Sequence, residues 1–326
     1  MAIFFTTLLA GLILGSCVYL LSKKVDFLKV CLKDKVTGIS RAGGLGIAAV
    51  FFMALFLSRQ VVMPDGLLPG LLLVFLLGLF DDIFDFGVKL KFSLQFLIAL
   101  FIVSAGVRFD FAYLSVVTDF LFSVIWIVGL MNAFNFLDIL DGLAAGIGAI
   151  SALAFISIGI LIQNQNVAVL GSAMAASNIS FLFFNFPKAR LYMGDIGSLF
   201  NGALFACAAI LATRDLSASG TAAWSLVFVL ALPILDLIFV IVMRVISRRP
   251  FFQKSRDHFV LRLVAGGLSR VRAVSLMYLF GVLFCAGAVL FLMPVNFFPV
   301  AVTLAVFAVA AWLYAAFKMS KVAIGN

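Results

Sequence analysis

Eleven long apolar runs divide this sequence, and each is long enough to cross a lipid bilayer as a helix. They cover residues 2–22, 43–62, 64–80, 92–107, 119–137, 143–163, 167–186, 196–213, 222–244, 273–292 and 297–316. The mean hydropathy of +1.26 and the low content of charged residues, 11%, exclude an ordinary soluble domain. We therefore expect an all-α, polytopic membrane protein with about 11 transmembrane helices, in which residues 1–326 form a single integral-membrane domain.

The basic residues predict how this chain lies in the membrane. If the eleven runs alternate in direction, 20 of the 23 Lys and Arg residues fall on one side, and Arg59, Arg108 and Arg214 fall on the other. Basic loops face the cytoplasm in most membrane proteins, so we expect the N-terminus outside and the C-terminus inside. Because Lys23 and Lys24 follow the first run and no basic residue precedes it, that run is predicted to be an uncleaved helix. The net charge of +9 then reflects orientation and contact with anionic membrane lipids, and does not indicate a nucleic-acid partner.

Four polar residues interrupt the apolar sequence between the fifth and sixth runs. Asn132, Asn135, Asp138 and Asp141 stand at three-residue steps. Each such step turns about 60° backwards around a straight helix, so the first and last residues cannot share a face unless the helix breaks. Gly142 is the predicted position of the break. We interpret this stretch as the lip of an active site, where a helix end turns its polar groups toward a solvent-filled cleft.

A pair of adjacent aspartates ends the third run. Asp81 and Asp82 lie at a predicted helix C-terminus, where negative charge opposes the helix dipole unless a cation is near. This favours a functional role for both residues, and a weaker one for Asp85. Lys91 opens the next helix, where it could bind a phosphate or extend to the membrane surface as an interfacial lysine.

Two further clusters follow on the same predicted side. Asp195 lies between two glycines in Gly-Asp-Ile-Gly-Ser, where it could cap a helix or sit beside a phosphate that approaches the backbone. Arg256 and His258, the only histidine, lie in the most basic loop and are candidates for contact with a diphosphate or nucleotide. Asp236 is interpreted as a helix-packing or hydrogen-bonding residue near the kink at Pro233.

These clusters are all predicted to face one compartment. They belong to loops at about 23–43, 81–91, 132–142, 185–198 and 244–272. Carboxylates beside basic loops suit a divalent metal and a phosphorylated substrate.

In this order the motifs resemble the polyprenyl-phosphate N-acetylhexosamine-1-phosphate transferase family, from Arg41-Ala-Gly43-Gly44 to about Arg272. The resemblance implies an enzyme in which a lipid phosphate, undecaprenyl phosphate, attacks the β-phosphate of a UDP-sugar. The products are UMP and a lipid-diphosphate-sugar that starts a cell-envelope glycan, and GlcNAc-1-phosphate or a related HexNAc-1-phosphate is the expected group. The resemblance also implies Mg²⁺ dependence, with Mn²⁺ as a substitute, a bacterial inner membrane, a cytoplasm-facing active site and a homodimer.

The matched positions carry the family's roles over to this chain. The resemblance implies catalytic roles for Asp81, Asp82, Asp138 and Asp141, and metal ligation by Asp195 and Asp82. The substrate-binding positions are Asn132, Asn135, Asn185, Lys91, Arg256 and His258. Whether Asp82 acts as a base or as a positioning group is left open.

The chain departs from the family pattern at two places. Ile139 stands where a glycine is usual, and Val260 and Leu261 stand where the loop motif usually has further histidines, although Arg262 is kept. These departures bear most on the identity of the sugar, and they count against the peptidoglycan relative, phospho-N-acetylmuramoyl-pentapeptide transferase. A secondary transporter with membrane carboxylates is the alternative of another class, and it would place its acidic site near the middle of the bilayer.

Overall fold

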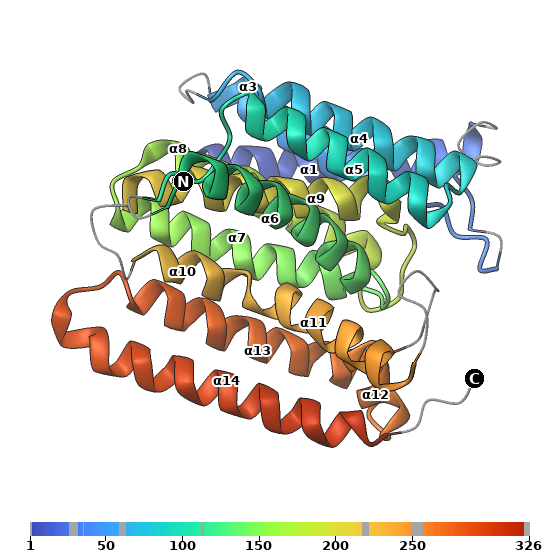
Figure 1. Ribbon diagram of the computed structural model, residues 1–326. Coiled ribbons are helices and arrows are strands. Elements are labelled where there is room, and N and C mark those ends of the chain that lie inside the picture. Colours follow the sequence, from blue (N-terminus) through green and yellow to red (C-terminus); the bar gives the residue numbers. More distant parts are fainter. Residues whose placement is uncertain are drawn as a thin grey trace.

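The computed structural model describes residues 2–25, 32–34, 36–58, 63–111, 114–216, 222–248 and 257–322. The described chain is helical, without a strand (Figure 1). The first helices are α1 (Ala2–Lys24), α3 (Gly43–Ser58), α4 (Leu67–Phe84), α5 (Val88–Ser104), α6 (Val116–Leu137), α7 (Leu143–Leu161) and α8 (Gln165–Asn185). They are followed by α9 (Gly194–Leu216), α10 (Ala222–Val229), α11 (Ala231–Ile246), α12 (Phe259–Ala265), α13 (Arg270–Leu290), the 3-10 turn η1 (Val295–Phe297) and α14 (Phe298–Ser320).

Each of the eleven predicted apolar runs coincides with helix in the structure. Within the described residues, eight helices are long and apolar enough to cross a membrane: α1, α4, α6, α7, α8, α9, α13 and α14. The helices α3 and α5 are shorter, with 16 and 17 residues. The protein is thus an all-helical, multi-pass membrane protein.

The ninth predicted run is broken into α10 and α11 around Leu230. Pro233 accounts for the break, since proline has no backbone N–H to donate to the carbonyl of Val229 four residues earlier. That carbonyl instead accepts a hydrogen bond from the Ser151 hydroxyl at 3.1 Å, so α7 satisfies the group that the break leaves free.

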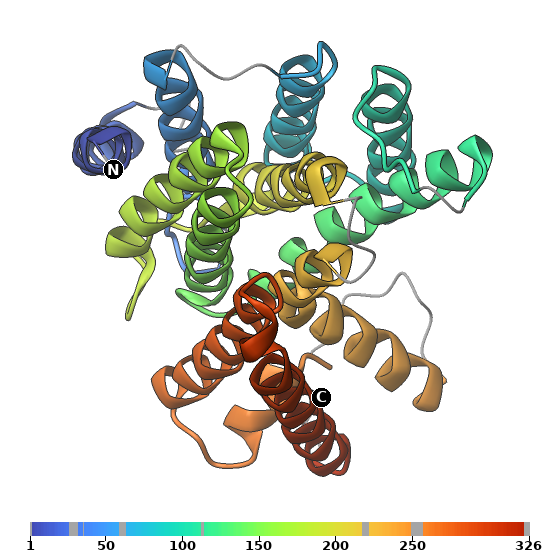
Figure 2. The same ribbon diagram turned by 90° about the vertical axis from the view of Figure 1, so that its left-hand side faces the viewer.

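Helix α9 lies at the centre of the bundle, and 94% of its most apolar 18-residue window is buried (Figure 2). It contacts α3, α4 and α6 along its length. Glycines permit the closest crossings: a Cβ on Gly44 of α3 would lie 2.3 Å from the backbone nitrogen of Gly197, and one on Gly78 of α4 would lie 2.6 Å from the carbonyl oxygen of Asp195. Small residues at such crossings bring the backbones of membrane helices together. The start of α9 is therefore held tightly against α3 and α4.

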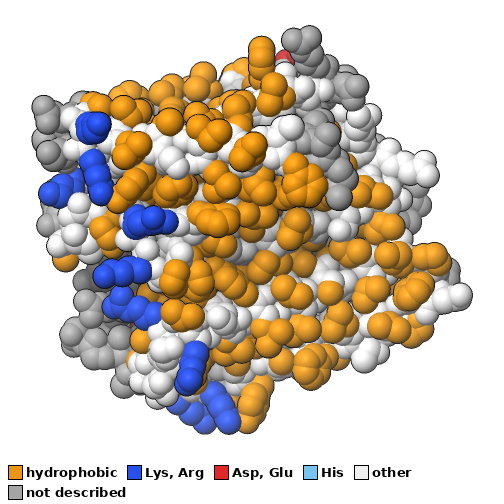
Figure 3. Space-filling view, turned by 180° about the vertical axis from the view of Figure 1, so that it is seen from behind, with side chains coloured by type: hydrophobic (Ala, Val, Ile, Leu, Met, Phe, Trp, Pro, Cys, Tyr) orange, Lys and Arg blue, Asp and Glu red, His pale blue; other side chains and the backbone are white. Residues whose placement is uncertain are grey.

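Lysine and arginine gather at one end of the bundle, which we call the basic end. Helices α4, α6 and α8 end there, and α5, α7 and α9 begin there. Figure 3 shows the basic side chains at one edge of the face, with apolar side chains covering most of the rest. A belt of apolar side chains with a charged rim is the surface expected of a protein embedded in a bilayer.

Candidate active site

The break between α6 and α7 forms one wall of a site at the basic end. Helix α6 ends at Leu137, so residues 138–142 form a turn that begins earlier than the predicted break at Gly142. Gly142 adopts φ +83°, a left-handed conformation that favours glycine. Its N–H donates to the side-chain oxygen of Asn185 at 2.7 Å, and its carbonyl accepts a hydrogen bond from the Tyr278 hydroxyl at 2.7 Å. The turn that exposes Asp138 and Asp141 is thus fixed by α8 and α13.

The end of α4 and the start of α9 form a second wall. The carboxylate of Asp82 accepts a hydrogen bond from the backbone N–H of Ile196 at 3.0 Å, so it caps the first turn of α9. The carboxylate of Asp81 points elsewhere and accepts the N–H of Phe86 at 2.9 Å. The two adjacent aspartates therefore serve two neighbouring parts of the site.

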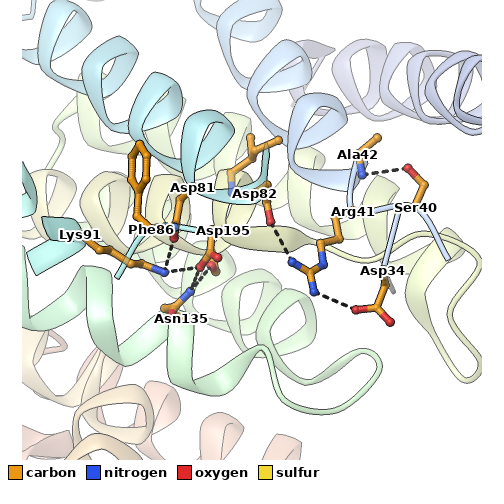
Figure 4. A network of polar contacts seen from close by, with 12 residues as sticks. Asp34, Ser40, Arg41, Ala42, Asp81, Asp82, Phe86, Lys91, Asn135 and Asp195 are labelled. Carbon is orange, nitrogen blue, oxygen red and sulfur yellow. Dashed lines mark hydrogen bonds and ion pairs between the residues drawn. The ribbon is translucent and has the colours of Figure 1, made fainter. Parts of the chain in front are cut away.

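Lys91 joins three of the predicted site residues (Figure 4). Its ammonium nitrogen lies 2.8 Å from an oxygen of Asp81 and 2.5 Å from an oxygen of Asp195. The side-chain amide of Asn135 donates to the same oxygen of Asp195 and to the hydroxyl of Ser198, the latter at 2.9 Å. Residues from α4, α5, α6 and α9 thus meet around one ammonium group. We call Asp81, Lys91, Asn135 and Asp195 the lysine cluster.

A pocket of about 740 Å³ opens beside the lysine cluster, which is within the usual size range of small-molecule sites. Its polar lining includes Asp82, Asn135, Asp138, Asp141 and Asp195. Opposite them, α12 and the start of α13 contribute Leu261, Val264, Ala265 and Arg270. The pocket therefore has an acidic wall and a wall that is apolar except for one arginine.

The electrostatics of the turn show that the acidic wall is short of positive charge. Burial, together with the neighbouring carboxylates of Asp195, Asp82 and Asp141, raises the pKa of Asp138 from 3.8 to about 8. One oxygen of Asp82 is buried without a hydrogen-bond partner among the described residues. Both observations indicate that the wall can accept a further cation.

The carboxylates of this pocket suit a magnesium ion that is also bound by water and by substrate phosphates. Within the described part of the chain, no group of three or more His, Cys, Asp or Glu side chains is arranged to hold a metal by itself. Magnesium usually keeps several waters and is held by one or two carboxylates together with substrate phosphates. The oxygen of Asp82 that accepts no hydrogen bond and the carboxylate of Asp195 match that requirement, whereas the described residues do not form a closed cage of protein ligands.

Two of the predicted site residues, Asp141 and Asn185, form hydrogen bonds with backbone groups at the pocket wall. Asp141 accepts the N–H of Ala189 at 3.0 Å, and Asn185 bonds Gly142 through its oxygen and the carbonyl of Leu191 through its amide, at 2.9 Å. Both residues line the pocket, and in this arrangement they shape it. A direct role for either residue in the reaction stays a prediction.

Asn132 and His258 lie behind the pocket lining. The amide of Asn132 donates to the side-chain oxygen of Gln95 at 2.7 Å and to the carbonyl of Val128. His258 is buried at the start of α12, with Nδ1 3.6 Å from Asp236 and its ring edge-to-face with Phe136. Contact of either residue with substrate stays a prediction. Arg256 lies outside the described residues.

Sequence reasoning did not assign a site role to Asp34, Arg41 or Tyr192, and all three line the pocket. Arg41 was counted among the basic residues that set the orientation and marked the start of the family resemblance, but it was given no role in the site. The signal that could have identified it is its place directly before Gly43 and Gly44, where α3 packs against the start of α9. The kept Arg262 bonds Asp257 at 3.0 Å and backbone carbonyls at the end of α14, so it anchors α12.

Comparison with known proteins agrees with this geometry. Glycosyl transferase family 4 matches residues 65–213, which include α4, the α6–α7 turn and most of α9. A probable undecaprenyl-phosphate N-acetylglucosaminyl 1-phosphate transferase of Bacillus subtilis is 33% identical over 277 residues, covering 78% of this chain and 74% of that protein. The chain belongs to glycosyl transferase family 4.

Two more relatives match different lengths of this chain. A decaprenyl-phosphate N-acetylglucosaminephosphotransferase of Mycobacterium leprae is 32% identical, covering 80% of this chain and 76% of the relative. A phospho-N-acetylmuramoyl-pentapeptide-transferase of Rubrobacter xylanophilus is 42% identical over 99 residues, only 29% of this chain and 30% of the relative. The predicted family resemblance is confirmed, and the chain is an enzyme of the sugar-phosphate transferase type. The transporter alternative is therefore set aside.

Proposed function

We propose that this enzyme transfers GlcNAc-1-phosphate from UDP-GlcNAc to undecaprenyl phosphate, releasing UMP, with Mg²⁺ bound at the acidic wall. Names of relatives that match most of the chain support the sugar phosphate and the polyprenyl acceptor. The observation that carries the proposal is the convergence of Asp82 from α4, Asp138 from the α6–α7 turn and Asp195 from α9 on one pocket at the basic end.

The residues of the site would act mainly by positioning and electrostatics. A phosphate monoester has its second pKa near 6, so the acceptor phosphate is largely deprotonated at neutral pH and needs little help from a general base. The lysine cluster fixes Asp195, and the N–H of Ile196 fixes Asp82. When bound, Mg²⁺ supplies the positive charge that phosphoryl transfer requires on the diphosphate oxygens. Asp82 and Asp195 would hold it, and Lys91 would fix the positions of the Asp81 and Asp195 carboxylates.

The choice of a small HexNAc group rests on the extent of the similarity. The relatives that share more than three quarters of this chain are named for N-acetylglucosamine, whereas the peptidoglycan relative shares less than a third. The apolar wall formed by Leu261, Val264 and Ala265 also differs from the histidine-rich loop expected for the peptidoglycan enzyme. These observations favour the GlcNAc reaction over transfer of a MurNAc-pentapeptide.

We propose that the basic end faces the cytoplasm of a bacterium, where UDP-sugars are made. Basic residues concentrate there, and α1 begins at the opposite end from that at which α14 ends (Figure 1). With α3, α5 and the broken α10–α11 pair as three additional crossings, the chain would cross the inner membrane eleven times, with the N-terminus outside and the C-terminus inside.

The test is a reaction with purified protein, undecaprenyl phosphate, Mg²⁺ and a panel of UDP-sugars, with UMP as the measured product. We expect UMP release with UDP-GlcNAc and its loss in the matched Asp82→Asn protein. Absence of UMP with every UDP-HexNAc would contradict the proposal. Release only with UDP-MurNAc-pentapeptide would favour the peptidoglycan reaction instead.

A further inference from the structure

The short loop before α3 is built to hold one arginine at the edge of the pocket. The N–H of Arg41 bonds the carbonyl of Leu32 at 2.6 Å, and the carbonyl of Ser40 accepts the N–H of Tyr192 at 2.8 Å. The N–H of Gly43 then bonds the carbonyl of Tyr192 at 3.0 Å. The backbone on both sides of Arg41 is therefore tied to the segment that leads into α9.

Asp34 holds the guanidinium group of Arg41 in place. An oxygen of Asp34 lies 2.8 Å from one terminal nitrogen of Arg41. The other oxygen accepts hydrogen bonds from the N–H groups of Val36 and Thr37 and from the Thr37 hydroxyl. Burial alone would raise the pKa of Asp34, but these hydrogen bonds and the one from Arg41 outweigh it and lower the pKa to about 2. Asp34 is thus ionised and fully engaged at neutral pH.

The other side of the guanidinium group faces the pocket and forms an ion pair with Asp82, but donates no hydrogen bond to a described side chain. Its second terminal nitrogen lies 3.8 Å from Asp82, beyond hydrogen-bond distance, and the side chain is 37% exposed. In the described part of the chain, Asp34 is the one side chain to which Arg41 donates a hydrogen bond. Arginine presents its N–H groups in a planar fork that matches two phosphate oxygens. Asp34 therefore holds the fork beside Asp82, where the second terminal nitrogen has an ion-pair contact but no hydrogen bond (Figure 4).

We propose that Arg41 is a phosphate-binding residue of this site and that Asp34 is its positioning residue. The inference rests on the proposed function for the identity of the phosphate, which belongs either to the lipid acceptor or to the diphosphate of the nucleotide sugar. The carboxylates of Asp82 and Asp195 repel either group, and Arg41 offsets that repulsion at the pocket.

The alternative is that Arg41 only braces its loop through Asp34. The two roles differ in what substitution does to binding. A bracing role predicts loss of thermal stability with unchanged affinity for phosphate ligands. A phosphate-binding role predicts loss of affinity in a protein that keeps its stability.

The experiment measures equilibrium binding of two probes, undecaprenyl phosphate and UDP-GlcNAc, to purified wild-type, Arg41→Gln, Arg41→Lys and Asp34→Asn proteins. Glutamine removes the charge and retains a side-chain N–H donor. Lys318→Ala is the matched control, since Lys318 is a basic residue at the end of α14, stacked on Tyr314, outside the pocket.

We expect Arg41→Gln to weaken one probe at least about 10-fold, the loss typical for a hydrogen bond to a charged group. The probe that is weakened identifies the phosphate. Arg41→Lys should recover part of that affinity, because the charge returns without the fork. Asp34→Asn should weaken the same probe and leave the other unchanged.

Unchanged affinity for both probes in folded Arg41→Gln protein would overturn the proposal. If Arg41→Gln does not fold, binding of the two probes to Asp34→Asn, which keeps the arginine, provides the test instead. Failure of the proposed function has a separate signature: wild-type protein would release no UMP, whatever Arg41 does to binding. In that case, weaker binding of a probe to Arg41→Gln protein would support the phosphate site, whereas the missing UMP would contradict the proposed reaction.

Discussion

Removing the charge of Lys91 tests the lysine cluster most sharply. In Lys91→Met, a neutral side chain of similar length replaces the ammonium group that lies 2.8 Å from Asp81 and 2.5 Å from Asp195. Two carboxylates then face each other without their shared cation. We expect the protein to lose stability when no divalent metal is present, and to regain most of it in Mg²⁺.

The size of the loss follows from the burial of the three side chains. Removing one partner of a buried ion pair costs about 3–5 kcal/mol. The Lys91 side chain is 16% exposed and that of Asp81 is 4% exposed, but Asp195 keeps 24% exposure, so water screens part of the repulsion. We therefore expect the lower end of that range, about 3 kcal/mol.

The assay is thermal unfolding in detergent, followed by the reaction of a thiol dye with Cys207 and Cys285, which are free and buried in the folded protein. Lys89→Met is the matched control, since Lys89 is exposed on the same helix and its substitution should change stability by less than about 0.5 kcal/mol. Each variant is measured in EDTA and in Mg²⁺. The reasoning is refuted if Lys91→Met and Lys89→Met unfold at the same temperature in EDTA, or if Mg²⁺ leaves the gap between them unchanged.

Three further predictions address the acidic wall. Asp82→Asn and Asp195→Asn should fold, because an amide oxygen can still accept a hydrogen bond. Their rate of UMP release should fall at least about 100-fold, as expected for loss of a group that acts on the transition state. Wild-type turnover in either variant would contradict the role assigned to that residue. Gly194→Ala should abolish activity, because φ is +70° and the added Cβ would lie 2.5 Å from an oxygen of Asp82; an active variant would show that Asp82 tolerates displacement. Burial and the neighbouring carboxylates raise the pKa of Asp138 to about 8, so the folded protein binds this proton more tightly than the unfolded chain, whose pKa is near 3.8. The stability of metal-free protein should therefore fall as the pH rises from about 4 to about 8, and thermal unfolding should show a smaller fall for Asp138→Asn; equal slopes would contradict this.

The helices could be predicted from the sequence because a bilayer leaves the backbone little alternative to helix. The hydropathy pattern indicated all eleven helical runs, and it could not show which of them span the membrane alone. The kink at Pro233 was predicted, but the hydrogen bond from the Ser151 hydroxyl to the carbonyl of Val229, which Pro233 cannot supply, was not. Such a contact between distant helices leaves no local pattern.

The site was predictable where residue type alone indicates chemistry. The paired Asp81 and Asp82 oppose the helix dipole at the C-terminus of α4, and Asp195 lies between two glycines at a helix start that a phosphate could approach. Their partners were not readable, because Asp195 meets Lys91 only through the packing of α5 against α4 and α6. Arg41 was missed for a related reason, since a basic residue in a basic loop is already explained by the orientation of the chain.

Asn185 shows the opposite case. Its residue type suggested contact with a nucleotide, whereas the structure commits both of its polar atoms to the backbone at Gly142 and Leu191. A buried asparagine that shapes a turn and one that binds a ligand have the same appearance in a sequence. The difference lies in which backbone groups the fold leaves without partners.

The central proposal is that the carboxylates of Asp82 on α4 and Asp195 on α9 hold a divalent cation against a substrate diphosphate. Mn²⁺ can replace Mg²⁺ as a spectroscopic probe, and its magnetic coupling to phosphorus in bound UDP-GlcNAc reports direct contact. We predict a ³¹P coupling in electron–nuclear double resonance spectra of the wild-type complex, and weakened Mn²⁺ binding in Asp82→Asn and Asp195→Asn. Equal Mn²⁺ affinity in all three proteins, with no ³¹P coupling, would contradict the account.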